Sequence, residues 1–506
     1  MDQQHSENVQ TGEDKQEKNL QEELEQLLKN IERKKEEEAN INQKHRVRLI
    51  EISRKEREYE SGLEAAAQKY QRKKEELDAV FQLLQNFGVE MTDAGYFEAP
   101  EVERREPFDS FDEAAEYLRD YLYASKEKLV YSADVLRCFY LGLQTNQLLL
   151  LVGRPGTGKT SLVRAFAKAF GFPDAVIVPV QSNWTGKEDL LGYYNPIEKT
   201  YIGTKFVDAL QDACRKARKH PELLYFICLD EMNLAHVEYY FAEFLSELQV
   251  PTGENPSIEL YSRQIAEDIM RELQYGGFDT SNTGTDNLQE QIRKSREERI
   301  SDMNIEERKY FLSLCRAAQM LANYQRELTI PRNVKFIGTL NQDATTMDIS
   351  PKVLDRSFVI RIETTSEIPQ IENAEDYARP LVYKPLADYA KNTDPLSQDD
   401  GKRIMRLAKK VQGKEWHRIA YISQRALSQV ILHENRDAWV QAMGLSSFLD
   451  YFIAATVLPK VRFAEEELYS GGKEQLSQLC ENYPYSEDIL KRMDDAEATE
   501  IDYWRE

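Results

Sequence analysis

The eight residues 153–160, Gly-Arg-Pro-Gly-Thr-Gly-Lys-Thr, constrain the fold of this chain more than any other feature. They match the phosphate-binding pattern G-x-x-x-x-G-K-[ST] at every fixed position. The apolar run 148–152 precedes them and predicts a buried strand, and the amphipathic run 161–170 that follows predicts a helix. Gly171 and Pro173 lie where that helix is expected to end. A strand, a glycine-rich loop and a helix in this order predict a P-loop, whereas a chance lysine in a glycine-rich turn would need neither flank.

The residue types suit a nucleoside triphosphate. Glycines let backbone N–H groups curl around phosphate oxygens, and the start of the helix adds partial positive charge. Lys159 can reach the β- and γ-phosphates, and the hydroxyl of Thr160 can bind Mg²⁺. The residues that we expect to hold the nucleotide are Gly153, Arg154, Pro155, Gly156, Thr157, Gly158, Lys159, Thr160 and Ser161.

A second apolar run, 223–229, ends in two acidic residues, Asp230 and Glu231. A carboxylate at the end of a parallel strand next to a P-loop can hold Mg²⁺, and the carboxylate after it can polarise the attacking water. We therefore expect Asp230 to be a metal ligand together with Thr160, and Glu231 to be the general base or to position the water. A pair of surface acids that only ends a strand is the alternative.

The order of the segments predicts an α/β fold. Apolar runs at 175–180, 334–340 and 358–362 also alternate with helical segments, as in a mostly parallel sheet with helices on both faces. We expect this core over 108–362, with a surface insertion at 261–325 that holds charged helical segments and a Gly/Thr/Asn/Ser-rich piece. A helical lid is expected over 363–483 and an acidic tail over 484–506.

The first part of the chain has a different composition. Residues 14–87 hold no proline and one glycine, Gly62, and are dominated by Glu, Lys, Gln and Arg. Apolar residues recur there at heptad spacing on both sides of a charged interruption, which predicts a long N-terminal coiled coil. A single solvated helix is the alternative. Residues 1–13 are expected to be disordered and 88–107 to form a linker.

The composition of the chain limits the kinds of partner that we expect it to bind. A net charge of −22 argues against a broad nucleic-acid-binding face, because duplex binding depends on cationic side chains, although a local basic groove or a narrow pore stays open. The five cysteines show no metal-ligand spacing and fit a reducing cytosol. The first thirty residues are mostly polar and no apolar stretch approaches a membrane span, so we expect a cytoplasmic protein without membrane contact.

Several segments resemble a known family. These are 230–235, Asp-Glu-Met-Asn-Leu-Ala, with the aromatic residues up to 246; 337–341, Ile-Gly-Thr-Leu-Asn; and 352–356, Lys-Val-Leu-Asp-Arg. They are similar to AAA+ nucleotide hydrolases of the McrB type, the motor subunits of modification-dependent restriction systems. The run 184–194 also resembles a segment of that clade and of its MoxR-like relatives. The resemblance spans 132–460 and implies an AAA+ P-loop core with a C-terminal helical lid, in a homo-oligomeric ring expected as a hexamer.

The resemblance also implies roles for single residues. Asn341 would be the first sensor, orienting water against the γ-phosphate. Arg356 would act in trans on the nucleotide of the neighbouring subunit, and Arg425 of the lid would be the second sensor. The alternatives are an asparagine that satisfies loop backbone, an Arg356–Asp355 ion pair and a surface cation. Trp184 and the turn-like run 201–204 would belong to an insert facing a partner or the pore, unless Trp184 is a core residue.

The sequence departs from the McrB pattern in two places. The family's Asn-x-x-Asp-Arg run, tied to GTP, is replaced by Asn-Gln-Asp-Ala at 341–344, so we expect ATP with Mg²⁺ and leave GTP open. A modified-base-reading domain at the N-terminus is replaced by the coiled coil, so little direct DNA binding is expected.

The leading hypothesis is a ring-forming motor that drives a McrC-like nuclease partner in antiphage defence, with the coiled coil contacting a further partner. A MoxR-like protein-remodelling chaperone is the alternative. A nucleotide-gated scaffold with negligible turnover is a third possibility, and the intact motif residues argue against it.

Overall fold

The structure is a computed structural model that describes residues 27–29, 33–34, 97, 103–248, 255–276, 305–342, 347–363, 365, 368–371, 373–390, 395–463, 466–493 and 501–504. The chain divides into two compact units, Met1–Gln82 with Ser281–Asn287, and Leu83–Thr280 with Leu288–Glu506. In the first unit only 27–29 and 33–34 are described, and they are helical. The disordered segment expected at 1–13, most of the coiled coil expected at 14–87 and most of the linker at 88–107 lie outside the described residues. The second unit is described below.

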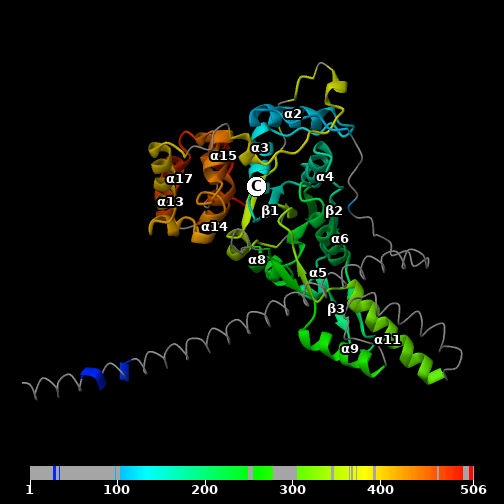
Figure 1. Ribbon diagram of the computed structural model, residues 1–506. Coiled ribbons are helices and arrows are strands. Elements are labelled where there is room, and N and C mark those ends of the chain that lie inside the picture. Colours follow the sequence, from blue (N-terminus) through cyan, green and yellow to red (C-terminus); the bar gives the residue numbers. More distant parts are fainter. Residues whose placement is uncertain are drawn as a thin grey trace, which may run out of the picture. The chain divides into compact units, whose positions relative to one another are not determined.

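Five strands form a parallel sheet in the order β2-β5-β8-β1-β9 (Figure 1). All residues of β1 are buried, and since neighbouring side chains point to opposite faces, both faces of the sheet are covered at its centre. The prediction of a mostly parallel sheet from five apolar runs is confirmed. The strands are β1 Leu148–Gly153, β2 Val176–Pro179, β5 Tyr225–Asp230, β8 Val334–Asn341 and β9 Ser357–Arg361.

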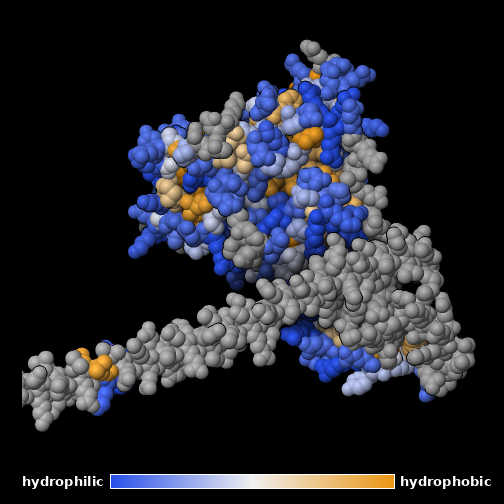
Figure 2. Space-filling view, viewed as in Figure 1, coloured by the Kyte–Doolittle hydropathy of each residue, from blue (hydrophilic) through white to orange (hydrophobic). Residues whose placement is uncertain are grey.

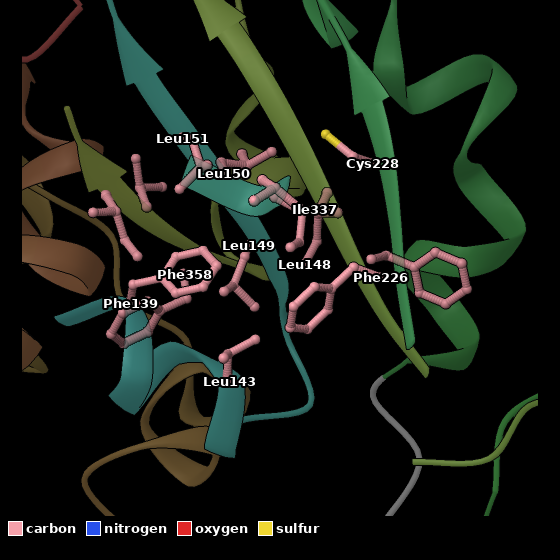
Figure 3. Packing of buried hydrophobic residues seen from close by; sticks show 14 of the residues in the cluster. Phe139, Leu143, Leu148, Leu149, Leu150, Leu151, Phe226, Cys228, Ile337 and Phe358 are labelled. Carbon is pink, nitrogen blue, oxygen red and sulfur yellow. The ribbon is translucent and has the colours of Figure 1, made fainter. Parts of the chain in front are cut away.

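Amphipathic helices cover the sheet and complete one hydrophobic core. Figure 3 shows Phe139 and Phe358 beside Leu149, which is paired in register with Phe358. Each such fully buried side chain contributes about 1.5–3 kcal/mol of hydrophobic free energy. The helices that contact the strands include α3 Ala133–Gln144, α4 Lys159–Ala169 and α6 Lys205–Lys219, and α2 Phe111–Ala124 packs on α3 and α4.

Two antiparallel pairs project from the connections of the core. The pair β3 Gly192–Asn195 and β4 Thr200–Gly203 follows the short helix α5 Lys187–Leu191. The pair β6 Ser257–Glu259 and β7 Glu327–Thr329 closes the base of the expected insertion, in which α9 Arg263–Tyr275 and α11 Ile305–Asn323 lie. Trp184 is half-buried against the ring of Tyr240, 5.2 Å between centroids, so it packs on the core. The links after β5 are η1 Met232–Leu234, α7 Val237–Tyr240 and α8 Ala242–Glu247.

The C-terminal part is helical, as the sequence predicts. After α12 Pro351–Leu354 and β9 come η2 Ala374–Tyr377, η3 Leu386–Tyr389, α13 Gln398–Val411, η4 Trp416–Arg418, α14 Gln424–Gln429, α15 Arg436–Met443, α16 Leu445–Phe452, η5 Ile453–Val457, η6 Leu458–Lys460, β10 Arg462–Phe463, α17 Glu466–Cys480, α18 Pro484–Met493 and β11 Ile501–Asp502. No single helix of the described ranges is long and apolar enough to cross a membrane, and one pair bent by 115°, Arg436–Met443 with Leu445–Lys460, meets that test by length and composition only.

The segment 484–506 differs from the acidic tail that the sequence suggests. Its residues 484–493 form α18, whose apolar residues Ile489, Leu490 and Met493 are buried. The buried carboxylate of Asp450 accepts the backbone N–H of Ser486 at 2.8 Å and thereby caps this helix. The acidic residues of α18 lie around an apolar face, and this spacing of apolar residues makes the segment part of the helical region rather than an appendage.

The surface in view is mainly hydrophilic. In Figure 2 the hydrophobic residues of the described part form small separate patches. Exposed large apolar side chains include Ile197 at 90% and Tyr275 at 87%, on two different projections. Scattered exposed apolar residues are usual on protein surfaces, so this face gives no direction to the search for a site.

Candidate nucleotide-binding site

The loop between β1 and α4 has the backbone that a phosphate cradle needs. Gly156 and Gly158 both have φ of +84°, in the left-handed region that glycine adopts without strain. A Cβ on Gly153 would lie 2.2 Å from the carbonyl oxygen of Ile362, so only glycine fits there. The rim of the loop, Arg154 to Gly156, is exposed, whereas Thr157, Gly158, Thr160 and Ser161 are half-buried. The predicted P-loop is therefore present.

Lys159 lies inside this loop. It is the first residue of α4 and only 6% exposed. Its Nζ donates to the carbonyl oxygens of Gly153 and Arg154, each at 2.8 Å. The ammonium group is thus held within the cradle, where it can exchange carbonyl oxygens for the oxygens of a bound phosphate.

Asp230 joins three elements at the carboxyl edge of the sheet. Its Oδ1 accepts hydrogen bonds from Thr160 Oγ1 at 2.6 Å and from Thr339 Oγ1 at 2.7 Å. The predicted pair of Thr160 and Asp230 is therefore in direct contact. Thr339 on β8 is 1% exposed, and its hydroxyl also accepts the backbone N–H of Glu231 at 2.9 Å.

Sequence reasoning missed Thr339. A signal existed, because Thr339 precedes Asn341 by two residues on the same strand and so faces the same side of the sheet. A hydroxyl at that position can reach the acid at the end of the neighbouring strand.

Glu231 and Asn341, which the sequence analysis gave separate roles at the nucleotide, are in contact. Asn341 Nδ2 donates to Glu231 Oε1 at 3.0 Å. Glu231 has φ of 53° and ψ of 48°, a left-handed conformation that costs a non-glycine residue about 1–3 kcal/mol. Such strain persists where surrounding contacts impose it, and the bond from the Glu231 N–H to Thr339 is one of them. The carboxylate of Glu231 is exposed beside the end of β8.

Asn233 is a second residue that sequence reasoning did not assign to the site. Its side-chain amide pairs with the backbone of Asn341 in both directions, Nδ2 to the carbonyl oxygen at 2.9 Å and Oδ1 from the N–H at 3.3 Å. Asn233 is 4% exposed, and its own carbonyl accepts the N–H of Met347 at 2.8 Å. This buried amide fixes the end of β8 relative to the loop after β5. The only signal was its place three residues after Asp230.

Tyr131 supports the P-loop from the segment before α3. It is 3% exposed, and its hydroxyl donates to the carbonyl oxygen of Gly158 at 2.8 Å. Burial, with a smaller effect of Glu127, raises the pKa of Tyr131, so the hydroxyl keeps its proton and remains a donor. This contact spans 27 residues of sequence and had no local signal.

Arg356 directly precedes β9, so it lies at the edge of the sheet opposite to the carboxyl ends of the strands, where the P-loop is. Its carbonyl oxygen accepts the N–H of Leu148 at the start of β1, at 3.3 Å. Gly153 follows five residues later, about 16 Å away at roughly 3.3 Å per residue. Arg356 is therefore not placed to serve the P-loop of its own chain.

Asp355, the residue before Arg356, is bound by residues of the helical region. Asp355 Oδ1 pairs with Lys460 Nζ at 2.9 Å and accepts the N–H of Ser423 at 3.2 Å. Burial alone would raise the pKa of Asp355, but Lys460 and Ser423 outweigh it and lower that pKa. Asp355 thus links the corner before β9 to the helical region. Arg425, the expected second sensor, is exposed on α14.

The donor set fits Mg²⁺ that arrives with a triphosphate. Mg²⁺ prefers oxygen ligands and is held by one or two carboxylates, with phosphate oxygens and water completing its shell. Thr160 and Asp230 supply one hydroxyl and one carboxylate in contact. Within the described ranges no group of three or more His, Cys, Asp or Glu residues could hold a metal ion alone. The phosphates of the nucleotide would have to provide the remaining ligands.

Comparison with known proteins agrees with this geometry. Residues 148–250 match the model of the AAA domain family, dynein-related subfamily. A similar solved structure is that of a putative ATPase from Cytophaga hutchinsonii, 13% identical, with 73% of this chain and 96% of that chain covered at a TM-score of 0.36. The family match contains the P-loop and the acid pair, so the stretch 148–250 is similar to an AAA domain, with a P-loop and an acidic strand end.

Proposed function

We propose that this protein hydrolyses ATP with Mg²⁺ and works as a homo-oligomeric ring. The observation that carries the proposal is the hydrogen-bonded chain of Thr160, Asp230, Thr339, Glu231 and Asn341 at the mouth of the P-loop. It brings a hydroxyl–carboxylate pair suited to Mg²⁺, a second carboxylate and a polar amide together beside the P-loop, which supports a site for the γ-phosphate there.

Each residue of the site has its own role in the proposed hydrolysis. Lys159 and the loop amides hold the phosphates, and Thr160 and Asp230 would hold Mg²⁺, which supplies neutralisation of phosphate charge. Glu231 accepts a proton from the attacking water, and Asn341 orients that water. The oxygen of the water bonds to the γ-phosphorus, and the bond from that phosphorus to the β–γ bridging oxygen breaks. The products are a nucleoside diphosphate and inorganic phosphate.

The identity of the nucleotide is also part of this proposal. We favour ATP because the run 341–344, Asn-Gln-Asp-Ala, lacks the arginine of the GTP-linked family pattern. GTP is the alternative substrate. Arg425, exposed on α14, is proposed to contact the nucleotide from the helical lid.

The ring is supported by the position of Arg356. At the amino end of β9 it is about 16 Å along the sheet from the P-loop of its own chain. A role in hydrolysis therefore requires a second copy that presents its P-loop to this edge.

The proposed biological role is a motor that drives a McrC-like nuclease in antiphage defence in the cytoplasm. Its support is the resemblance of the segments 230–246, 337–341 and 352–356 to McrB-type proteins. The N-terminal coiled coil is proposed to contact a further partner, and little direct DNA binding is expected from a chain of net charge −22.

A MoxR-like chaperone is the second candidate, favoured by the run 184–194. Neighbouring genes separate the two: a nuclease subunit supports defence, and a protein with a von Willebrand-type domain supports the chaperone.

Phosphate release from Mg-ATP and Mg-GTP tests the enzymatic part. Glu231→Gln should lower kcat by about 10²–10⁴-fold, the usual contribution of a general base. Glu116→Gln, the same change on the exposed face of α2, is the matched control and should leave kcat unchanged. Equal phosphate release by wild type and Glu231→Gln would remove Glu231 from the role given to it.

A further inference from the structure

The last described residues return to the helical region and are bound to it. Residues Ile501–Asp502 form β11, which pairs antiparallel with β10. Trp504 Nε1 donates to the carbonyl oxygen of Pro459 at 3.0 Å. Tyr503, between these contacts, is 0% exposed.

The same residues also contact the sheet at the edge that holds the nucleotide site. The carbonyl oxygen of Tyr503 accepts from Arg361 Nη1 at 2.9 Å and from Gln342 Nε2 at 3.3 Å. Arg361 ends β9, and Gln342 directly follows Asn341 at the end of β8. The guanidinium of Arg361 also lies 5.6 Å from the centre of the Tyr503 ring. One backbone carbonyl thus joins the ends of two strands of the sheet.

The two side chains that donate to the Tyr503 carbonyl are buried. Gln342 is 7% exposed, and the side chain of Arg361 is 9% exposed. Buried donors need acceptors, so removing the carbonyl of Tyr503 would leave two donors poorly satisfied. Arg361 keeps a second partner, Glu363, at 2.6 Å from its Nε, so Gln342 depends more on this contact.

We propose that residues 501–504 form a strap that couples the helical region to Asn341, and that Tyr503 is a positioning residue for hydrolysis. The expected effect of the strap on hydrolysis rests on the proposed function. The strap holds Gln342 on one side and Pro459 on the other, so a movement of the helical region is transmitted to the residue next to the sensor. The hydroxyl of Tyr503 has no hydrogen-bond partner in the described part of the chain, so the ring and the backbone carry the role.

The experiment compares the full chain with a truncation after Asp502, Tyr503→Ala and the matched control Tyr503→Phe. Steady-state kinetics give kcat and KM for Mg-ATP. Hydrogen exchange of peptides covering Val334–Asn341 and Ile453–Lys460 reports the junction without any turnover. We expect truncation to lower kcat about tenfold with KM within about twofold, to speed exchange at the end of β8, and Tyr503→Phe to match wild type.

The outcomes are separable. If wild type itself does not turn over ATP, the proposed function fails, and the exchange data still decide the strap. Unchanged exchange at the end of β8 after truncation overturns the strap, and so does a loss in Tyr503→Phe equal to that in Tyr503→Ala. If truncation speeds exchange throughout, including α6, Gln342→Leu decides, because it removes the donor next to Asn341 and leaves the tail and the Arg361 contact intact. Wild-type kcat in that variant would overturn the proposal.

Discussion

The role of Thr339 gives the sharpest test of the site. Thr339→Val keeps the shape and β-branching of the side chain and removes one hydroxyl. That hydroxyl donates to the carboxylate of Asp230 at 2.7 Å and accepts the N–H of Glu231 at 2.9 Å. A hydrogen bond to a charged group contributes about 1.5–3 kcal/mol, and Thr339 is only 1% exposed. If about 2 kcal/mol of this is expressed in the transition state, kcat falls about 30-fold.

The assay is phosphate release at saturating Mg-ATP, together with the affinity of a fluorescent ATP analogue. We expect the affinity to change less than about threefold, because the P-loop and Lys159 are untouched. Thr339→Ser keeps the hydroxyl and should retain most activity, and Thr329→Val is the same substitution at an exposed strand position. A kcat within twofold of wild type for Thr339→Val would refute the argument that this hydroxyl aligns the acid pair.

Three other outcomes follow from the same geometry. Gly158→Ala should abolish nucleotide binding, because its φ is +84° and its Cβ would lie 2.7 Å from the Tyr131 hydroxyl; fluorescent ATP titration checks this. Asp355→Asn should lower the free energy of unfolding in urea at pH 7. Since the folded pKa of Asp355 lies below its usual 3.8, that deficit should shrink as the pH falls through the folded pKa. Equal mixtures of Arg356→Ala and Lys159→Ala, each inactive alone, should regain activity at about a quarter of ring interfaces.

Each of these three has a clear contrary result. Wild-type affinity in Gly158→Ala would mean that the loop adapts to a side chain at this position. A deficit in Asp355→Asn that persists at the lowest pH would show that shape rather than charge is lost, and Asp376→Asn, an exposed carboxylate, is its control. Mixed variants that stay inactive would remove Arg356 from a role between subunits.

The core of the fold could be predicted because its signals are local. Each of the five strands is a short, mainly apolar run, β1 is buried at every residue, and the P-loop fixes the order of strand, loop and helix around it. Glu231 and Asn341 were each expected near the γ-phosphate, and the structure adds that they lie at the ends of neighbouring parallel strands and are hydrogen-bonded.

What could not be predicted depends on register and on distant contacts. Thr339 acts only because β8 pairs beside β5 in one register, with Leu229 opposite Gly338. Tyr131 and Tyr503 reach the site from segments whose own sequence carries no motif. The local charge of 484–506 predicts an acidic tail, whereas the contacts of Tyr503 are made with Arg361 and Gln342 on distant elements.

The contacts of the site make catalysis conditional on binding. Lys159 is held by two carbonyl oxygens of its own loop, and the carboxylate of Glu231 is held by Asn341. Both groups must exchange these partners before one can bind phosphate and the other can accept a proton from water. The phosphates of a bound nucleotide would supply the free energy for this exchange. A site built in this way would keep the proposed base engaged until a triphosphate enters. In a ring, the same condition ties each hydrolytic event to the state of the subunit interface that Arg356 is proposed to complete.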